Sequence, residues 1–398
     1  MIMKLSSNLA TACAVLALSV SVRAADQKEH QFYGDAPDEH HPWAIHDSNR
    51  PQPLIVTPGN FSNQEKPGQP PSDAIVLFDG SDISKWEADA NGHVPTKWVV
   101  RDGAMECVPS SGFVRTKEEF GDCQLHVEWA APTKAEGHSQ GRGNSGVFLM
   151  GLFEIQVLDN YNNPTYADGM AASLYGQHEP MANALRPPGQ WQVYDIVFRR
   201  PIYKGNDLVE AGYVTVFENG VLVQDHAVIE GETGHMGRTR AHAIPNAGPL
   251  KLQDHGNPVR YRNIWYRRLP ARAVEGGTDG YLTAEATTAK RAEIAAGLRQ
   301  DAAKAVNPAN PLPEMLLLAE SLTYTKDEAT YQKVDKTLVQ YLADFKQLPA
   351  DKAAAKKDEV RRLREVFQYL IKFKVFPAGY APKAEIDAII KDHAWDKR

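Results

Sequence analysis

The spacing of apolar residues changes once along this chain, near Pro270, and that change constrains the fold more than any other feature. Between about residues 74 and 269, apolar and polar residues alternate in short runs such as 124–129 and 153–158. This alternation is typical of half-buried strands, and Asn219-Gly220 favours a tight hairpin turn. Many short strands with no helical periodicity between them predict a mainly β fold, an antiparallel β-sandwich or jelly roll.

Beyond residue 270 the apolar residues recur at three- and four-residue spacing, as at Val360, Leu363, Phe367 and Leu370. This spacing predicts an α-helical C-terminal region over 271–398, with three to five helices. Contact with another protein and self-association are both open for it. Residues 25–72 contain eight prolines and little periodicity, and they are predicted to form an extended arm or linker.

The first 24 residues have the pattern of a secretory signal peptide. Lys4 precedes an uncharged stretch over roughly residues 9–22, and Val22-Arg23-Ala24 is a small-residue cleavage pattern. We therefore expect cleavage after Ala24 and a secreted or periplasmic protein. No later segment has the run of about 18 apolar residues that a membrane span needs, so no span is expected.

Charge and cysteine content narrow the classes of partner. The chain has 44 Lys and Arg against 50 Asp and Glu, a net charge of −6. This balance argues against a nucleic-acid surface and against anionic lipid, and leaves carbohydrates open. Nor do we expect a nucleotide cofactor. Cys107 and Cys123 follow the signal peptide, and a disulfide and two buried free thiols are both open for them.

Several polar residues stand out against the strand pattern. Alternation places His126 with Glu128 on one face of a strand, and Glu154 with Gln156 on one face of another. These faces are too polar to form a second core, so each is either solvent surface or part of a binding groove. Asn144 lies in a Gly-Asn-Ser-Gly turn directly before a strand.

Basic residues form a second set of candidates near the end of the β region. Arg260 and Arg262 share a face by alternation and require acidic neighbours or an anionic ligand. Lys251 precedes them, and His255 lies beside a glycine in a turn. His255 is a candidate acid, base or metal ligand, and a backbone-bonded loop histidine is the alternative.

An ordered set of motifs over residues 73–270 resembles the bacterial 3-keto-disaccharide hydrolase domain. The motifs are Phe78-Asp79-Gly80, Gly121-Asp122, Gly143-Asn144-Ser145-Gly146, Glu154-Ile155-Gln156-Val157-Leu158-Asp159, Leu174-Tyr175-Gly176, Gly189-Gln190-Trp191, and the stretches 252–256 and 260–264. The resemblance implies a concanavalin-like jelly roll of the glucanase type. It also implies cleavage of glycosides that carry a ketone at C3. The helical region lies outside the resemblance.

Such a substrate dictates what the site must supply. A C3 ketone acidifies the C2 proton, so a base can remove it, the enolate expels the C1 substituent, and water then adds to the enone. We expect Glu128, Glu154 and His255 to be catalytic. The candidates that hold the sugar are Asn144, Gln156, Tyr175, Lys251, Arg260 and Arg262. A divalent metal is a candidate electrophile, with Asp159 as its ligand and Glu154 or His255 as co-ligand.

Two other functions are open on the same fold. Laminarinase-type glucanases carry Glu-x-Asp-x-x-Glu, and Glu154, Gln156 and Asp159 fall at that spacing. Retaining hydrolysis needs two carboxyl groups about 5–5.5 Å apart, and Gln156 cannot share a proton as the middle Asp would. A non-catalytic carbohydrate-binding, lectin-like module is the other alternative, because this fold hosts both enzymes and lectins.

Overall fold

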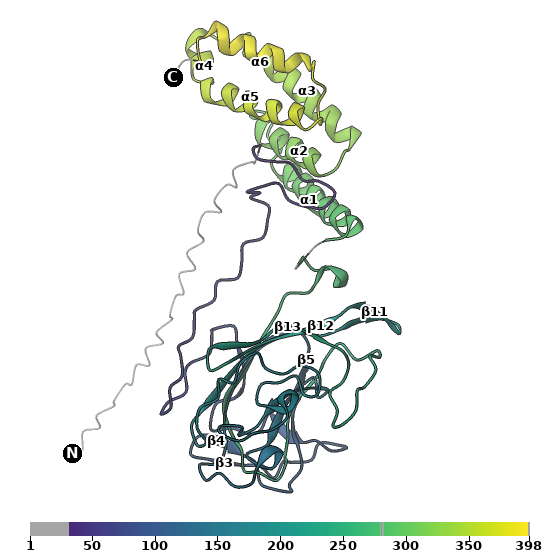
Figure 1. Ribbon diagram of the computed structural model, residues 1–398. Helices are drawn as coiled ribbons and strands as arrows, with labels where there is room; N and C mark the ends of the chain where they lie inside the picture. The colour runs from purple at the N-terminus through teal and green to yellow at the C-terminus, as the bar shows by residue number, and fades with distance from the viewer. Residues whose placement is uncertain (1–31, 279, 281, 397–398) are drawn as a thin grey trace, which may run out of the picture. The chain divides into compact units, whose positions relative to one another are not determined.

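The computed structural model describes residues 32–278, 280 and 282–396, and it divides into two compact units. The β unit comprises residues 53–283, and the helical unit comprises residues 32–52 together with residues from 284 onward. The helices belong to the green-to-yellow part of the chain in Figure 1. The described part of the predicted arm, residues 32–72, is therefore divided between the units after residue 52. The predicted signal peptide lies outside the described residues.

The β unit contains two antiparallel sheets and a separate hairpin. The large sheet has the strand order β13-β12-β9-β6-β15-β4-β3, and β1 pairs with β15 beside this path. Its strands are β1 (Ile75–Phe78), β3 (Val99–Arg101), β4 (Ala104–Glu106), β6 (Cys123–Ala130), β9 (Gln192–Arg199), β12 (Gly212–Glu218), β13 (Val221–Ile229) and β15 (Arg260–Arg268).

The small sheet has the order β2-β5-β14-β7-β8. Its strands are β2 (Trp86–Ala88), β5 (Val114–Phe120), β7 (Ser145–Leu149), β8 (Phe153–Val157) and β14 (Gly248–Leu252). The separate hairpin is formed by β10 (Ile202–Lys204) and β11 (Asp207–Glu210). Three short 3₁₀ turns occupy Ser139–Gly141, Ala167–Gly169 and Ala273–Glu275.

Alternate residues of both sheets meet in one core. Leu125, Val127 and Trp129 of β6 pack in the same buried cluster as Val147 of β7 and Ile155 of β8. The intervening residues of each strand lie on the opposite, outer face of their own sheet. The two outer faces are therefore on opposite sides of the sandwich. This confirms the predicted mainly β sandwich.

The predicted hairpin turn at Asn219-Gly220 connects β12 to β13. Both residues have positive φ, 53° for Asn219 and 83° for Gly220. Two consecutive positive φ values match a type I′ turn, whose twist suits two antiparallel strands. Asn219 also accepts a hydrogen bond at its side-chain oxygen from Val193 N (3.0 Å). The turn is thereby tied to the neighbouring strand β9.

The helical unit has six helices among its described residues, one more than the predicted upper limit. They are α1 (Ala284–Lys304), α2 (Leu312–Tyr324), α3 (Glu328–Phe345), α4 (Ala350–Ala354), α5 (Lys357–Lys372) and α6 (Ala381–Asp392). Val360, Leu363, Phe367 and Leu370 of α5 are buried, as their spacing predicts. Residues 32–52 join this unit because Phe32 packs in its core against Tyr369.

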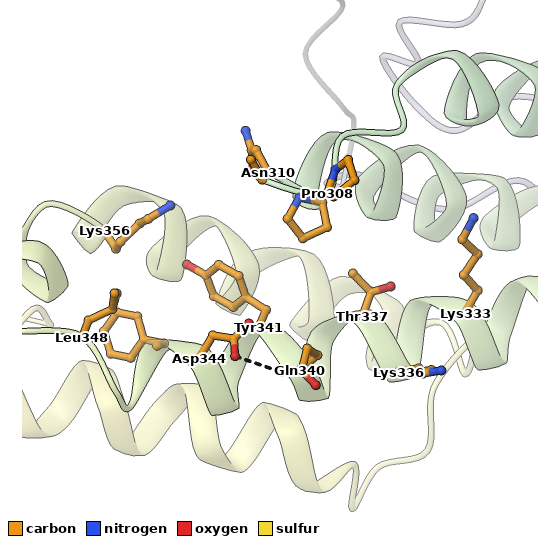
Figure 2. A pocket seen from close by; sticks show the side chains of 13 residues that line it. Pro308, Asn310, Lys333, Lys336, Thr337, Gln340, Tyr341, Asp344, Leu348 and Lys356 are labelled. Carbon is orange, nitrogen blue, oxygen red and sulfur yellow. Dashed lines mark hydrogen bonds between the residues drawn. The ribbon is translucent and has the colours of Figure 1, made fainter.

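The helical unit contains a hollow of about 640 Å³ between the 308–311 connection and helix α3. Figure 2 shows its lining, which includes Lys333, Tyr341 and Lys356. Lys333 pairs with Glu314, while Lys356 pairs with Glu359, which also accepts a hydrogen bond from the Tyr341 hydroxyl. These polar groups of the hollow are therefore already partnered within the unit.

Cys107 and Cys123 are buried free thiols, which resolves the alternative left open by the sequence. Burial raises the pKa of both thiols. They therefore stay protonated and pack as small apolar groups. Within the described part of the chain, no helix is both long and apolar enough to cross a membrane.

Candidate active site

A row of side chains crosses the outer face of the small sheet. The antiparallel register sets Glu87 opposite Arg115, Arg115 opposite Lys251, Lys251 opposite Phe148, and Phe148 opposite Glu154. Directly opposite residues share a face, so this row runs across all five strands. The next row on the same face includes Gly146 opposite Gln156. Two of the predicted candidates, Glu154 and Gln156, therefore lie side by side on β8.

Glu154 has the most strongly perturbed carboxyl group on this face. Its side chain is buried, and burial raises its pKa to about 8. With its amide oriented to satisfy its neighbours, Gln156 donates a hydrogen bond to Glu154 Oε1 (3.0 Å). A carboxyl group with a pKa near the working pH suits general acid–base catalysis.

Gly146 makes room for this carboxyl group. A Cβ added at Gly146 would lie 2.3 Å from Glu154 Oε1 and 2.8 Å from Phe148 Cε2. Real Cβ contacts are never so short, so a side chain at this position would displace one group or both. Gly146, the last residue of the Gly143-Asn144-Ser145-Gly146 motif, lies in β7 at a position where a larger residue would clash with Glu154 and Phe148. The same geometry shows that the Glu154 carboxylate and the Phe148 ring edge are neighbours.

Amides gather beside Glu154. Asn144 is buried and donates from Nδ2 to the backbone carbonyl of Gln140 (2.7 Å). The Gln156 amide lies 3.1 Å from the side chain of Gln140. Gln140 itself is held through Nε2 by the carbonyl of Gly169 (2.8 Å). These amides offer neutral donors and acceptors of the kind that bind sugar hydroxyls.

A cleft of about 450 Å³, to which several side chains contribute polar groups, lies beyond β8. Its lining includes Tyr166, Asp168, Tyr175, His235 and Arg238. The Tyr175 hydroxyl is hydrogen-bonded to the Tyr166 hydroxyl (2.9 Å) and to His235 Nδ1 (3.0 Å). The cleft adjoins the row above, because Tyr175 N donates to the backbone carbonyl of Glu154 (3.1 Å). Its volume falls within the range of small-molecule sites.

Burial raises the pKa of Tyr175 well above its usual value, and the hydrogen bond with Tyr166 adds to the rise. The hydroxyl therefore stays protonated at neutral pH and can donate a hydrogen bond. Tyr175 was predicted as a sugar-binding residue, and it lines the cleft. Tyr166 and His235 were not predicted. The sequence signal for His235 is weak, since it lies in a long Gly-rich loop between β13 and β14 without periodicity.

The structure does not bring the predicted catalytic residues together. Lys251 joins the row on the small sheet, where it pairs with Asp89 (2.9 Å). His255 is exposed in the turn after β14, where its backbone carbonyl accepts a hydrogen bond from Asn257 Nδ2 (3.1 Å). Glu128 lies on β6 of the large sheet, whose outer face points away from Glu154. Glu128 and Glu154 therefore cannot act in one site.

Asp159 does not fit the predicted role of metal ligand. One of its carboxylate oxygens accepts from Arg142 Nη2 (2.9 Å), and the other pairs with Arg142 Nε (2.9 Å). A guanidinium held by both oxygens already neutralises this carboxylate. Over the described ranges no three His, Cys, Asp or Glu side chains form a group suited to a metal ion. The same contacts remove Asp159 from any retaining carboxylate pair with Glu154.

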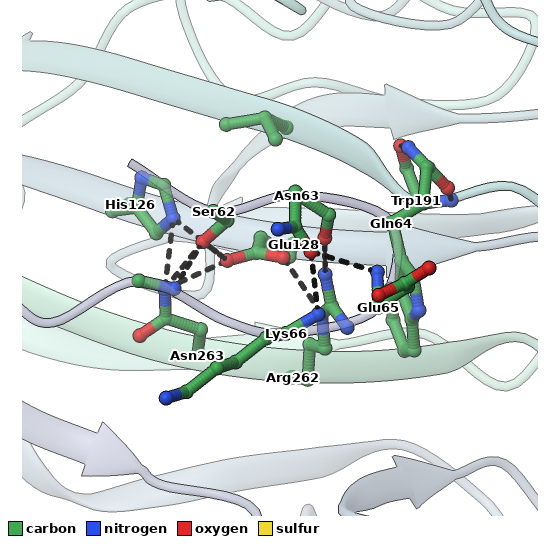
Figure 3. Close-up of polar contacts among 12 residues, drawn as sticks. Ser62, Asn63, Gln64, Glu65, Lys66, His126, Glu128, Trp191, Arg262 and Asn263 are labelled. Atoms are coloured by element: carbon green, nitrogen blue, oxygen red, sulfur yellow. Dashed lines mark hydrogen bonds and ion pairs between the residues drawn. The ribbon is translucent and has the colours of Figure 1, made fainter. Parts of the chain in front are cut away.

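Glu128 and Arg262 instead form an ion pair on the outer face of the large sheet (Arg262 Nε to Glu128 Oε2, 2.7 Å). Both are buried, and residues 62–66 of the arm cover them (Figure 3). The Ser62 hydroxyl donates to Glu128 Oε1, and Asn63 O accepts from Arg262 (2.6 Å). Asn263, an extra residue at a bulge in β15, donates to Glu128 Oε1 (2.7 Å).

Two further contacts anchor residues 62–66, here called the arm tip, on this face. Gln64 makes two hydrogen bonds with the backbone of Trp191, of 2.9 and 2.7 Å. The guanidinium groups of Arg262 and Arg260 lie 4.2 and 5.3 Å from the Trp191 ring centroid. Arg260 and Arg262 thus share a face as predicted. In this structure Arg262 contacts the arm at Asn63 O and the Trp191 ring, so these contacts hold the arm on this face.

His126 completes the buried network. Its Nδ1 is hydrogen-bonded to Asp195 (2.7 Å), and its Nε2 lies 3.3 Å from Glu128 Oε1. Although burial opposes protonation, the hydrogen bonds with Asp195 and Glu128 raise the pKa of His126 to about 9. For Glu128, burial alone would raise the pKa of the carboxyl group. Hydrogen bonds from His126, Ser62 and Asn263, together with the charge of Arg262, nevertheless hold this pKa below its usual value. Two cations and two carboxylates therefore balance within the network.

Comparison with known proteins agrees with this fold. A family model described as the 3-keto-alpha-glucoside-1,2-lyase-like domain matches residues 73–267. The chain belongs to this family. A 3-keto-disaccharide hydrolase from Bacteroides thetaiotaomicron is 26% identical over 237 residues, which span 48% of this chain and 76% of that protein.

The solved structure of a protein from Parabacteroides distasonis, which is described as a predicted glycosyl hydrolase, has 45% sequence identity to this chain. The match covers 55% of this chain and 93% of that one, with a TM-score of 0.53. The family domain covers the whole row from Glu87 to Lys251 and the cleft beside Glu154. It ends before the helical unit. It also begins after the arm tip that covers Glu128.

Proposed function

We propose that the β unit cleaves 3-keto-glycosides, with Glu154 as the base that removes the C2 proton. The observation that carries this proposal is the Glu154 carboxyl, buried on the small sheet beside this cleft, with a pKa of about 8. Family membership supplies the class of substrate. Positioned general bases contribute about 10²–10⁴ in rate.

The reaction divides into two steps that balance. Glu154 takes the C2 proton, the electron pair moves to the C3 oxygen as an enolate, and the enolate expels the C1 substituent as its alcohol. Water then adds across the resulting enone and gives the 3-keto sugar. This route avoids the oxocarbenium-like transition state of ordinary glycosidases. The proton that Glu154 gains is the one that the leaving oxygen requires.

The cleft supplies what the enolate requires. The Tyr175 hydroxyl keeps its proton and is a donor for the developing C3 oxyanion, supported by Tyr166 and His235 through their hydrogen bonds. Asn144 and Gln156 provide neutral hydrogen bonds for ring hydroxyls. Asp159, the predicted metal ligand, is instead paired with Arg142 through both carboxylate oxygens.

We also propose that the protein is exported. Support comes from the charge and hydropathy pattern of the first 24 residues, with the cleavage motif that ends at Ala24. An extracytoplasmic enzyme would meet glycosides from outside the cell. N-terminal sequencing of the protein recovered from the periplasm or the medium tests this, and a chain that begins at Ala25 is expected.

The function is tested with matched native and 3-keto glucosides, with and without EDTA, while aglycone release is followed. We expect release from the keto substrate alone, and no loss with EDTA, since the described residues contain no group of three His, Cys, Asp or Glu side chains suited to a metal ion. Release from the native glucoside would favour a glucanase. Binding without release from either substrate would favour the lectin alternative.

The pH dependence follows from the raised pKa of Glu154. A base must be ionised, so kcat/KM is expected to rise about tenfold per pH unit between pH 6 and 7 and to level off above about pH 8. Initial rates at low substrate concentration over pH 5.5–9.5 measure this profile. A profile that falls through pH 8 would assign Glu154 as an acid instead.

A further inference from the structure

Two phenylalanines lie on the outer face of the small sheet beside Glu154. Phe148 stands directly opposite Glu154, and Phe113 precedes β5. Their ring centroids are 5.8 Å apart, with the planes tilted by 48°. Both side chains are only partly buried, although most large apolar residues of this unit lie in the core. A partly exposed ring pair on an otherwise polar face suits an apolar ligand surface.

The ring of Phe148 is next to the reacting group. Its Cε2 atom and Glu154 Oε1 both lie within 3 Å of the point that a Cβ on Gly146 would occupy. The cleft with Tyr175 lies on the other side of Glu154, across the edge of β8. Glu154 therefore stands between a cleft with polar groups and an aromatic pair. A glycoside cleaved at C1 has the same two-part character, with a hydroxyl-rich ring on one side of the bond and the leaving group on the other.

Charges beyond the ring pair are internally matched. Lys251 pairs with Asp89 (2.9 Å), and Arg115 pairs with Glu87 (3.0 Å) and lies 3.7 Å from Asp89. Two cations thus face two carboxylates across β2, β5 and β14. This balance leaves no net charge to attract an ionic ligand. His93, largely exposed, adds a contact to Glu87 (2.7 Å).

We propose that Phe113 and Phe148 form the leaving-group subsite and take a flat, uncharged ring face. This inference rests on the proposed function and adds the class of leaving group to it. An aromatic aglycone and the apolar face of a second pyranose both present such a surface. The matched charges around the subsite disfavour leaving groups that carry a carboxylate or a phosphate.

The test compares three 3-keto-glucosides of the anomer that the wild type accepts: methyl, benzyl and glucosyl. Methanol and benzyl alcohol have similar acidity, so they differ as leaving groups mainly in the ring. Phe148→Leu and Phe113→Leu remove one ring while keeping an apolar side chain. Phe217→Leu, on the partly exposed outer face of the large sheet, is the matched control.

For Phe148→Leu and Phe113→Leu we expect kcat/KM on the benzyl or the glucosyl substrate to fall about tenfold relative to the methyl substrate. Stacked ring contacts contribute about 0.5–1.5 kcal/mol each, up to about tenfold. The substrate whose relative kcat/KM falls most, benzyl or glucosyl, shows whether the subsite prefers an aromatic ring or a pyranose. Phe217→Leu should leave all three ratios unchanged. The ratio is taken within one variant, so a partly unfolded preparation does not alter it.

The outcomes separate the two proposals. If the wild type cleaves 3-keto substrates but all ratios stay within twofold in both variants, the subsite is wrong and the proposed function stands. If the wild type prefers the methyl substrate over both others, the subsite is also wrong. If it cleaves none of the three, the proposed function fails, and the leaving-group subsite fails with it.

Discussion

Glu154→Gln is expected to lower kcat/KM on a 3-keto-glycoside by about 10³-fold without loss of stability. The amide keeps the shape of the carboxyl but cannot accept the C2 proton. Stability should not fall, because the pKa of Glu154 is raised from its usual value to about 8. Between those two pH values the unfolded chain ionises while the folded chain stays protonated, so burial of Glu154 lowers stability as pH rises. A neutral Gln removes that cost at pH 7.

Glu128→Gln is the matched control, and we expect it to lower stability while activity is retained. The substitution is identical, but Glu128 holds Arg262, Asn263 and the arm tip on the opposite outer face (Figure 3). Its pKa is lowered, so it contributes stability above its usual pKa and loses that contribution as pH falls. Removing one partner of a buried ion pair costs about 3–5 kcal/mol. Activity at a temperature where the fold persists should stay within about threefold of wild type.

Steady-state kinetics and thermal unfolding at pH 7 check the pair together. If Glu154 is the base, Glu154→Gln must lose activity but not stability, and Glu128→Gln must lose stability but not activity. If Glu128→Gln abolishes cleavage in a folded protein while Glu154→Gln remains active, the base lies on the large sheet. If both lose activity only in proportion to unfolded protein, neither carboxyl group is the base.

Strand periodicity predicted much of the fold and the shared face of three pairs of candidates. Glu154 and Gln156 share an outer face, as do His126 and Glu128 and the arginines 260 and 262. Alternation depends on local geometry alone, so it can be recognised from a short run of residues. It does not identify the sheet that a strand joins. Glu128 and Glu154 have the same local pattern, and long-range pairing separates them.

Other parts of the site required the three-dimensional structure. His235 and Tyr166 belong to segments without periodicity, and they meet Tyr175 only because the loops converge beyond β8. The arm was predicted to be a proline-rich linker. In the structure, Ser62 and Gln64 make hydrogen bonds with Glu128 and Trp191, which lie far along the chain. Such contacts depend on tertiary structure, and nothing in the local sequence of residues 57–72 indicates them.

Gly146→Ala should reduce kcat/KM by about 10²-fold while the protein remains folded. The new Cβ would lie 2.3 Å from Glu154 Oε1 and 2.8 Å from Phe148 Cε2, and both atoms are the far ends of side chains that can move. Gly146 does not have a positive φ, so alanine suits its backbone. The displacement therefore moves the carboxyl group of Glu154, the proposed base, and a shift of about 1 Å can cost 10²-fold in rate.

Gly141→Ala is the control for this prediction, because it lies on the same approach to β7 and a Cβ there meets no atom within 4 Å. Its activity should stay within about twofold of wild type. In Gly146→Ala the displaced carboxyl group should also be less buried, so the rising limb of the pH profile is expected to move below pH 8. Thermal unfolding establishes that both variants are folded. Full activity and an unshifted profile in Gly146→Ala would show that catalysis does not depend on the position of Glu154 between Gly146 and Phe148.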